Sequence, residues 1–197
     1  MSLAIIDSGG ANIASLMFAL ERLGVPSELT TDKQRLRSAS HVILPGVGTA
    51  ADCMARLEKA DLTDAIRSLR QPLLGICVGM QLMFESSEEG DVQCLGLLPG
   101  RVRRFPDRAG LPVPHMGWNQ VRSRKPTSLL SDIEDGAYVY FVHSYAAPVS
   151  ELALATTDYG GEFTALVQRG NIFGAQFHPE RSAKVGAQLL KNFLAVK

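Results

Sequence analysis

Residues 73–81 read Leu-Leu-Gly-Ile-Cys-Val-Gly-Met-Gln, and they constrain the fold of this chain more than any other stretch. An apolar run typical of a buried strand leads to a single cysteine, and apolar residues at helical spacing follow at once. The pattern predicts a strand, a sharp turn at Cys77 and a helix. Small residues are needed around such an elbow, because a Cβ atom at Gly75 or Gly79 would collide with the adjoining strand or helix.

The thiol of Cys77 is a candidate nucleophile. At the apex of an elbow it would project from the carboxyl edge of a sheet, beside the first N–H groups of the next helix. Those donors and the helix dipole favour a thiolate over a thiol. The alternative is a small buried hydrophobic residue, which is the commoner fate of an intracellular cysteine. The two glycines favour the nucleophile but do not indicate its substrate.

Strands and amphipathic helices alternate through residue 87. Strands are expected at 3–6, 25–30 and 41–44, a helix at 13–23, and a long helix from Met54 to Leu69. This alternation predicts an α/β fold with a doubly wound, mostly parallel sheet and helices on both faces.

The sequence pattern changes after Gly90, where short strand-like segments are separated by turns rich in Pro, Gly and Asp. They predict antiparallel strands added to the sheet. These pieces cover residues 101–105, 120–122, 138–142, 152–156, 165–168 and 172–175. A final helix is expected from Val185 to Leu194.

Length and composition limit the class of protein. With 197 residues, 46% of them hydrophobic, and no repeat or linker, the chain is expected to form one domain over residues 1–197. Twenty basic residues balance twenty acidic ones, which argues against nucleic acid or an anionic membrane as a partner. Three scattered cysteines suit neither a disulfide framework nor a zinc site. Because no apolar segment is long enough for a signal peptide or a membrane span, we expect a cytoplasmic protein.

A second group of chemically active residues lies late in the chain, at Gln176-Phe177-His178-Pro179-Glu180. The residue before a proline is extended, and extended residues two apart point the same way. His178 and Glu180 are therefore expected side by side. The carboxylate would keep one imidazole nitrogen protonated, leaving the other to take a proton from a thiol. A lone histidine at a strand end is usually just a polar terminus, and we treat His41 as structural.

Glycine-containing turns follow two of the early strands. Pro45-Gly46-Val47-Gly48-Thr49 can present backbone N–H groups inward, as half of an oxyanion site opposite Cys77, or can be an ordinary strand-to-helix turn. Gly9-Gly10 lacks the spacing of a dinucleotide-binding loop.

These motifs resemble those of the class I (triad-type) glutamine amidotransferases. Gly75–Gln81 is similar to the cysteine elbow of that family, and His178-Pro179-Glu180 to its late His-Pro-Glu segment. The resemblance runs the length of the chain. It implies a flavodoxin-like domain that uses no cofactor and hydrolyses glutamine with a triad of Cys77, His178 and Glu180.

Further segments narrow the resemblance to the histidine-biosynthetic branch of the family. They are Pro45–Thr49, Pro114–Asn119 and Tyr140–Tyr145. This branch implies a heterodimer with a (β/α)₈-barrel cyclase that receives the ammonia. One departure is the first turn, which often reads Asp-Tyr-Gly-x-Gly-Asn in such chains but is Asp-Ser-Gly-Gly-Ala-Asn at residues 7–12 here.

The resemblance also implies roles for individual residues. The oxyanion donors would be the N–H of Val78 and one from Gly46-Val47. Contacts with glutamine are expected from Gln81, His143, Ser144, Tyr145 and Glu89. Gln81 can equally be a solvent-facing helix residue. Trp118, beside Asn119, is expected to anchor the partner interface, with a core aromatic as the alternative.

Other functions stay open on the residues alone. A flavodoxin-like sheet with an elbow cysteine can belong to a redox-sensing or chaperone-like protein, or to a binding subunit without catalysis. Within the amidotransferases, subunits of anthranilate or aminodeoxychorismate synthase are the nearest alternatives. The paired His178 and Glu180 argue against the sensor, which has no need of them.

Overall fold

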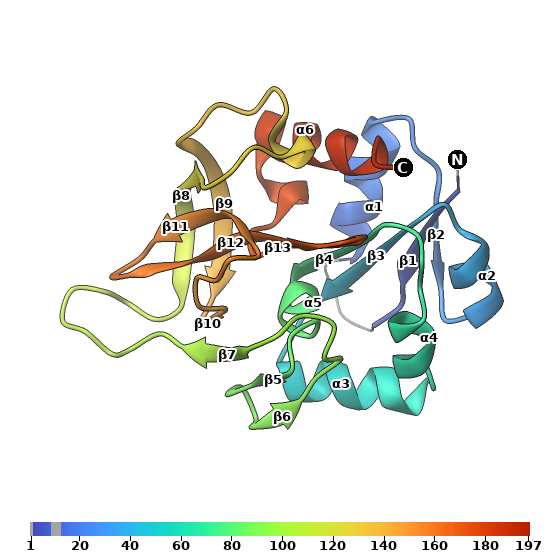
Figure 1. Ribbon diagram of the computed structural model, residues 1–197, viewed down its shortest axis with the longest axis horizontal. Coiled ribbons are helices and arrows are strands. Elements are labelled where there is room, and N and C mark those ends of the chain that lie inside the picture. The colour runs from blue at the N-terminus through green and yellow to red at the C-terminus, as the bar shows by residue number, and fades with distance from the viewer. Residues whose placement is uncertain (1, 9–12) are drawn as a thin grey trace.

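The computed structural model describes residues 2–8 and 13–197, so the Gly9-Gly10 turn lies outside the described residues. Its largest element is a mixed sheet (Figure 1). The strands of this sheet are β1 (Leu3–Ile6), β2 (Ser27–Thr30), β3 (His41–Gly46), β4 (Leu73–Cys77), β8 (His115–Ser123), β9 (Ala137–His143), β11 (Ala153–Asp158), β12 (Glu162–Arg169) and β13 (Ile172–Ala175). Their order across the sheet is β2-β1-β3-β4-β13-β12-β11-β8-β9.

Helices cover both faces of the sheet, as the sequence predicts. They are α1 (Ile13–Arg22), α2 (Lys33–Ser38), α3 (Ala50–Lys59), α4 (Thr63–Arg67), α5 (Val78–Gln81) and α6 (Ala183–Leu194), with 3₁₀ helices η1 (Ser128–Leu130) and η2 (Pro179–Arg181). In Figure 1, α1 and α6 lie above the sheet, and α3, α4 and α5 lie below it. The prediction of a doubly wound α/β fold is confirmed.

Strand directions divide the sheet into two halves. β1, β2, β3 and β4 pair in parallel, whereas β12, β11, β8 and β9 pair antiparallel. β13 joins the halves, because it runs parallel to β4 on one side and antiparallel to β12 on the other. The sequence predicted β13 only as one more antiparallel strand. Its pairing with β4 brings the cysteine elbow and the His-Pro-Glu segment side by side.

The strand predicted at 101–105 belongs to a different sheet. β7 (Arg101–Arg104) pairs in parallel with β5 (Ser86–Ser87) and antiparallel with β10 (Tyr145–Ala146), and β6 (Val92–Gln93) completes this small sheet. Only Val102 of β7 is buried. A strand with only one buried side chain is too polar for the interior of the main sheet, which explains why β7 belongs to a separate, smaller sheet.

Three expectations about helices need correction. The long helix from Met54 to Leu69 is broken into α3 and α4, because Asp61 has a φ of 54° and turns the chain between them. The elbow helix α5 is a single turn, so the apolar residues after Gln81 lie in turns. Helix α2 was not predicted. Only Leu36 of its six residues is buried, which leaves no apolar periodicity to read.

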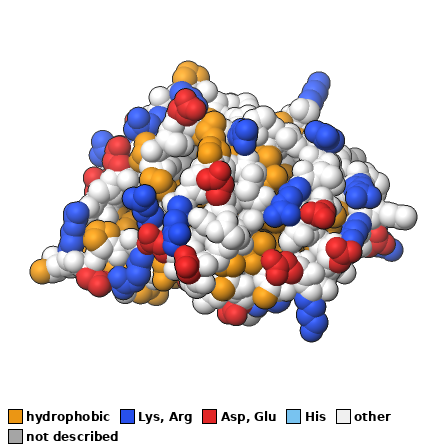
Figure 2. Space-filling view, turned by 60° about the horizontal axis from the view of Figure 1, so that its bottom comes forward, with side chains coloured by type: hydrophobic (Ala, Val, Ile, Leu, Met, Phe, Trp, Pro, Cys, Tyr) orange, Lys and Arg blue, Asp and Glu red, His pale blue; other side chains and the backbone are white. Residues whose placement is uncertain are grey.

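The face below the sheet carries mixed charge. Figure 2 shows basic and acidic side chains interspersed over it. Strand β7 carries two ion-paired arginines, with Arg101 paired to Asp91 at 2.6 Å and Arg104 to Asp107 at 2.9 Å. Within the described ranges, no helix is both long and apolar enough to cross a membrane.

Helix α6 is anchored to the core by Phe193, whose side chain is 0% exposed. Its ring packs edge-to-face against Phe173 of β13, with the ring centres 6.0 Å apart, and against His41 at 5.3 Å. His41 also hydrogen-bonds the Val196 carbonyl through Nε2 at 3.0 Å. These contacts give His41 the structural surroundings that the sequence analysis expected.

We expect Phe193→Ala to lower the free energy of unfolding by about 3–5 kcal/mol, because it opens a cavity in a closely packed core. Urea unfolding followed by circular dichroism measures the change. Phe18→Ala is the matched control, since Phe18 is 59% exposed and its removal should change stability by less than about 0.5 kcal/mol. Equal effects of the two substitutions would contradict this account of the core.

Candidate active site

The turn at Cys77 has the strained geometry that the sequence predicts. Cys77 ends β4 with φ 53° and ψ −114°, in a region that side-chain-bearing residues rarely adopt. Helix α5 begins at the next residue, Val78. The cysteine side chain is only 4% exposed. A strained, buried turn of this kind fixes the position of the sulfur.

Glycines allow the elbow to lie directly against its neighbours. A Cβ atom on Gly79 would stand 1.9 Å from the Leu44 carbonyl oxygen of β3, and one on Gly75 would stand 2.7 Å from the Gly79 oxygen. The predicted collisions are therefore confirmed. Gly46, at the end of β3, is as tightly placed, because its Cβ would lie 2.3 Å from the Gly79 nitrogen.

His178 and Glu180 form a buried pair beside the elbow. The Nδ1 atom of His178 lies 2.7 Å from Oε1 of Glu180, and Cys77 lies near enough to the imidazole to raise its pKa. The predicted contact is present, but its predicted cause is wrong. The chain does not continue extended after His178. Instead, η2 coils over Pro179–Arg181 and turns the carboxylate back onto the ring.

The surroundings of His178 favour its charged form. Burial alone would lower the pKa of the imidazole, but the neighbouring Cys77 and Glu180 favour its charged form and raise the pKa of His178 to about 10. The ring therefore carries a proton at neutral pH. A proton held next to the sulfur is available for transfer to a leaving group.

A cavity of about 200 Å³ opens at Cys77. It is lined by Gly48, Cys77, Val78, Gln81, Glu89, Pro114, Val142, His143, Ser144 and Tyr145. All five residues expected to contact a substrate line it. Glu89 accepts a hydrogen bond from the Ala50 N–H at 2.7 Å, and burial raises the pKa of its carboxyl group.

Gln81 is not a solvent-facing residue, since only 1% of it is exposed. Its Nε2 donates to the Tyr145 carbonyl at 2.8 Å and to Oε1 of Gln176 at 3.0 Å. Gln176 in turn places its own Nε2 3.9 Å from the sulfur of Cys77. Sequence reasoning assigned no role to Gln176. The available signal was a polar residue inside the apolar run from Phe173 to Phe177.

The expected oxyanion segment lies across from the elbow. Gly46 pairs with Cys77 in the β3–β4 register, and a Cβ on Gly46 would stand 2.7 Å from Val78. The next carbonyl, that of Val47, accepts hydrogen bonds from Arg56 Nη2 at 3.0 Å and Cys53 Sγ at 3.3 Å. Turning the peptide that follows Val47 would break both of these hydrogen bonds.

His143 and His115 form a buried pair at the wall of the cavity. The Nδ1 atom of His143 lies 2.8 Å from the Tyr145 carbonyl oxygen, and its Nε2 lies 3.1 Å from Nδ1 of His115. Burial lowers the pKa of His143 to about 3 and the pKa of His115 to about 4. Both rings are neutral at physiological pH.

Trp118 lies on the surface of β8 and is 52% exposed, so the alternative of a core aromatic is wrong. Met116 and Tyr138 are exposed beside it, at 63% and 55%. The amide of Asn119 is instead bonded to the Asp158 carbonyl and to His115. Successive residues of a strand face opposite sides, which explains why Trp118 and Asn119 differ.

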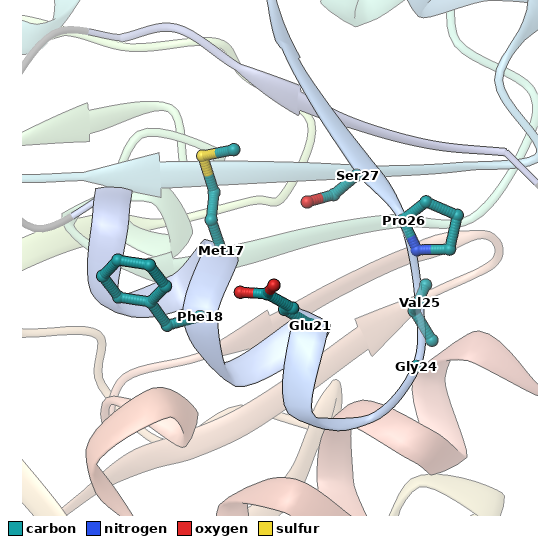
Figure 3. Close-up of a pocket in the computed structure, with 7 residues that line it drawn as sticks. All are labelled: Met17, Phe18, Glu21, Gly24, Val25, Pro26 and Ser27. Carbon is teal, nitrogen blue, oxygen red and sulfur yellow. The ribbon is translucent and has the colours of Figure 1, made fainter.

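A larger cavity of about 450 Å³ lies elsewhere, between α1 and the start of β2 (Figure 3). Met17, Phe18 and Glu21 project from the helix, opposite Pro26 and Ser27. Glu21 is the one ionisable residue in its lining, and no residue expected to be functional contributes to it. Size alone therefore does not identify the reactive site.

The other two cysteines, Cys53 and Cys94, are free thiols buried away from solvent. Burial raises the pKa of Cys94 to about 11, so this thiol stays protonated at neutral pH. In the part of the chain that the structure describes, no group of three or more His, Cys, Asp and Glu side chains is arranged to hold a metal ion.

Known proteins are similar to this chain over nearly its whole length. The profile of the family "Glutamine amidotransferase class-I" matches residues 4–196. The chain is 56% identical over 191 residues to "Imidazole glycerol phosphate synthase subunit HisH" of Xylella fastidiosa, covering 97% of this chain and 96% of that protein. It is 55% identical over 191 residues, with the same coverage, to the protein of that name from Xanthomonas axonopodis pv. citri.

Solved structures share the fold at low sequence identity. A crystal structure of a glutamine amidotransferase superposes with a TM-score of 0.74 at 20% identity, covering 98% of this chain and 96% of that one. PurLQS from Thermotoga maritima gives a TM-score of 0.72 at 21% identity, with coverage of 98% and 97%.

The buried histidine pair predicts acid destabilisation. Both pKa values are lower in the folded than in the unfolded state, so the unfolded chain binds more protons below pH 6.5. The contribution of these two histidines to stability should be complete above pH 6.5 and should fall as the pH drops toward 4. The slope is about 1.4 kcal/mol per pH unit for each histidine. His178 adds little in this window, because it is protonated in both states.

Urea unfolding of the wild type and of His115→Gln, at several values between pH 7 and pH 4.5, measures this slope. The variant should show a shallower loss of stability with falling pH, since one of the two titrating rings is gone. An unchanged slope would contradict the assignment of a neutral, buried His115.

Proposed function

Since this chain belongs to the class-I glutamine amidotransferases, we propose that Cys77, His178 and Glu180 are its catalytic triad. The chain acts as the glutamine-hydrolysing subunit of imidazole glycerol phosphate synthase, in histidine biosynthesis, as its 55–56% identity to HisH proteins supports. The observation that supports the proposal is the position of the His178 imidazole, which hydrogen-bonds the Glu180 carboxylate and has its pKa raised by the neighbouring Cys77.

The first half of the reaction forms a thioester. The sulfur of Cys77 attacks the side-chain amide carbon of glutamine, and the carbonyl π electrons move onto oxygen. The oxyanion would receive hydrogen bonds from the Val78 N–H and from the Gly46–Val47 segment. One such donor is worth roughly 10²–10³ in rate. When the tetrahedral intermediate collapses, the C–N bond breaks and His178 gives its proton to the departing nitrogen, which leaves as ammonia.

The second half releases glutamate. His178, now neutral, takes a proton from a water molecule that attacks the thioester carbon. Collapse of this second intermediate breaks the C–S bond and regenerates the sulfur of Cys77. Glu180 keeps the ring oriented by accepting from Nδ1, which leaves Nε2 to face the sulfur and the substrate.

Glutamine would bind in the cavity at Cys77. The carboxylate of Glu89, which lines this cavity, would meet its α-ammonium group, and the backbone of His143-Ser144-Tyr145 would meet its amino-acid end. Because the nitrogen of Gln81 already donates to Tyr145 and Gln176, the substrate would meet the amide oxygen of that side chain.

Ammonia released into water would be protonated and lost as a nucleophile. We therefore expect a heterodimer with a (β/α)₈-barrel cyclase, into which ammonia passes to make imidazole glycerol phosphate and aminoimidazole carboxamide ribotide. The exposed Trp118, beside Asn119, is the expected anchor of this interface, with Met116 and Tyr138 around it. A cytoplasmic location fits a biosynthetic complex of this kind.

Relatives at 55–56% identity favour the histidine pathway over subunits of anthranilate or aminodeoxychorismate synthase. The redox-sensing or chaperone-like alternative predicts no need for Glu180. A non-catalytic binding subunit would not be labelled stoichiometrically at Cys77 by a glutamine-analogue electrophile. Both alternatives are therefore tested by experiments on the triad.

We expect Cys77→Ala to abolish glutamine hydrolysis in the presence of the cyclase, and Glu180→Gln to lower kcat by about 10²–10⁴ with little change in KM. The neutral amide still fills the space but no longer stabilises the imidazolium. Ammonia release is the measurement. Glu162→Gln, which alters an exposed ion pair with Arg124, is the control and should keep full activity. Wild-type kcat in Glu180→Gln would rule out the triad.

Glutamine hydrolysis by the isolated chain should be slow and should rise when the liganded cyclase is added. Glycines at 46 and 48, the latter with a φ of 96°, allow the oxyanion peptide two orientations, and the partner would favour the productive one. Turnover measured with and without the cyclase checks this. Equal rates would contradict the proposed regulation but not the proposed catalytic triad.

A further inference from the structure

The sulfur of Cys77 has two polar neighbours besides His178, and they favour opposite protonation states. The Val142 carbonyl oxygen lies 3.8 Å away and can only accept a hydrogen bond, so it favours the thiol. The Nε2 atom of Gln176 lies 3.9 Å away and can only donate, so it favours the thiolate. Hydrogen bonds to a charged group are the stronger kind, which gives the amide the larger effect.

The orientation of the Gln176 amide is fixed by its neighbour. Its oxygen accepts from Nε2 of Gln81 at 3.0 Å, so the nitrogen end must face the sulfur. Gln81 cannot turn around, because its second amide hydrogen is donated to the Tyr145 carbonyl at 2.8 Å. Both side chains are buried, with exposures of 0% for Gln176 and 1% for Gln81.

The Tyr145 carbonyl connects this pair of amides to the buried histidines. It also accepts from Nδ1 of His143 at 2.8 Å, which leaves Nε2 of the neutral ring as an acceptor. The Nδ1–H of His115 fills that position at 3.1 Å. The remaining nitrogen of His115 then accepts from Nδ2 of Asn119 at 3.3 Å. Every donor and acceptor along this chain is determined by the one before it.

This series of hydrogen bonds depends on both histidines being neutral. His115 is stacked between the rings of Tyr159 and Phe141, with centres 4.0 and 4.9 Å away. Phe105 and Phe163 pack against His143. A protonated ring would donate from both nitrogens and would place two donors against each other. The charge on His178 opposes a positive charge on His143, and a protonated His115 would do the same.

We propose that Gln176 is a positioning residue for the nucleophile, held by Gln81 and by the neutral chain that runs through the Tyr145 carbonyl and His143 to His115 and Asn119. Gln176 directs its amide N–H at the sulfur of Cys77 and stabilises the thiolate before glutamine binds. This role rests on the proposed catalytic function of Cys77. It gives β8, which carries the exposed Trp118, a continuous polar connection to the reactive sulfur.

Alkylation of Cys77 by iodoacetamide tests this without any substrate. The full-length chain is treated between pH 5.5 and pH 9, and the extent of modification is read by peptide mass spectrometry, which separates Cys77 from Cys53 and Cys94. We expect Gln176→Leu to react about 10-fold more slowly below pH 7 and its rate profile to move to higher pH, because the donor to the thiolate is lost. Gln176→Glu should react at least as slowly, since a carboxylate repels the charged sulfur.

Gln71→Leu is the matched control. Gln71 donates its amide nitrogen to the Leu36 carbonyl at 2.6 Å and does not contact Cys77. It should leave the alkylation profile of Cys77 unchanged. Near-ultraviolet circular dichroism establishes that each variant is folded, and Gln176→Met, which is unbranched and closer in shape, replaces Gln176→Leu if that variant is not.

The His115→Phe substitution tests the series of hydrogen bonds from the Tyr145 carbonyl to Asn119. It keeps the packing but removes both ring nitrogens. Its alkylation should slow in the same direction by about two- to fivefold. Combined with Gln176→Leu it should add nothing further, because both changes act through the same amide. An additive effect would show that His115 acts by another route.

Kinetics with glutamine and the cyclase separate positioning from binding. Gln176→Leu should lower kcat with KM within about twofold of the wild type, since Gln176 does not line the cavity. A folded Gln176→Leu variant that is alkylated like the wild type throughout the pH range would overturn the proposal. The alkylation result does not depend on glutamine hydrolysis, so failure of the proposed function would be seen separately, as wild-type protein without turnover.

Discussion

The site depends on direct contact between the backbone of the elbow and the backbone of β3. A single Cβ at Gly79 would come within 1.9 Å of the Leu44 oxygen, and neither partner can move freely, because Leu44 lies in the buried strand β3 and Gly79 in the buried helix α5. This contact holds Cys77 in a conformation that costs on the order of 1–3 kcal/mol. The surrounding sheet offsets that cost. In return the sulfur has one position, and the other groups of the site are arranged around it.

Local pattern was enough to predict the architecture, where the pattern was strong. The apolar runs of β1, β3 and β4 and the amphipathic faces of α1 and α6 are visible in the sequence, and they dictate a parallel sheet covered on both sides. Helix α2 was not predicted, because a short helix with one buried residue shows no apolar periodicity. The break between α3 and α4 was not predicted, because it depends on the left-handed backbone of Asp61. The apolar residues keep their helical spacing across this break.

The site was predictable to the extent that its residues are adjacent in sequence. Glycines around Cys77, and an acid two residues after His178, are local signals. The role of Gln176 is not local, because it depends on the register of β13 against β4. The pairing of His115 with His143 likewise requires that β8 and β9 meet in one particular register. No property of either histidine in the sequence reveals the other.

The position of β13 in the middle of the sheet affects how the protein folds during its synthesis on the ribosome. Cys77 and Gln176 are 99 residues apart, so β4 emerges with one edge unpaired and must wait for its neighbour. At about 5–20 residues per second, translation leaves that edge open for roughly 5–20 seconds. During that interval the nascent elbow has neither its imidazole nor its amide. The groups around Cys77 are therefore complete only after β13 and η2 have been synthesised.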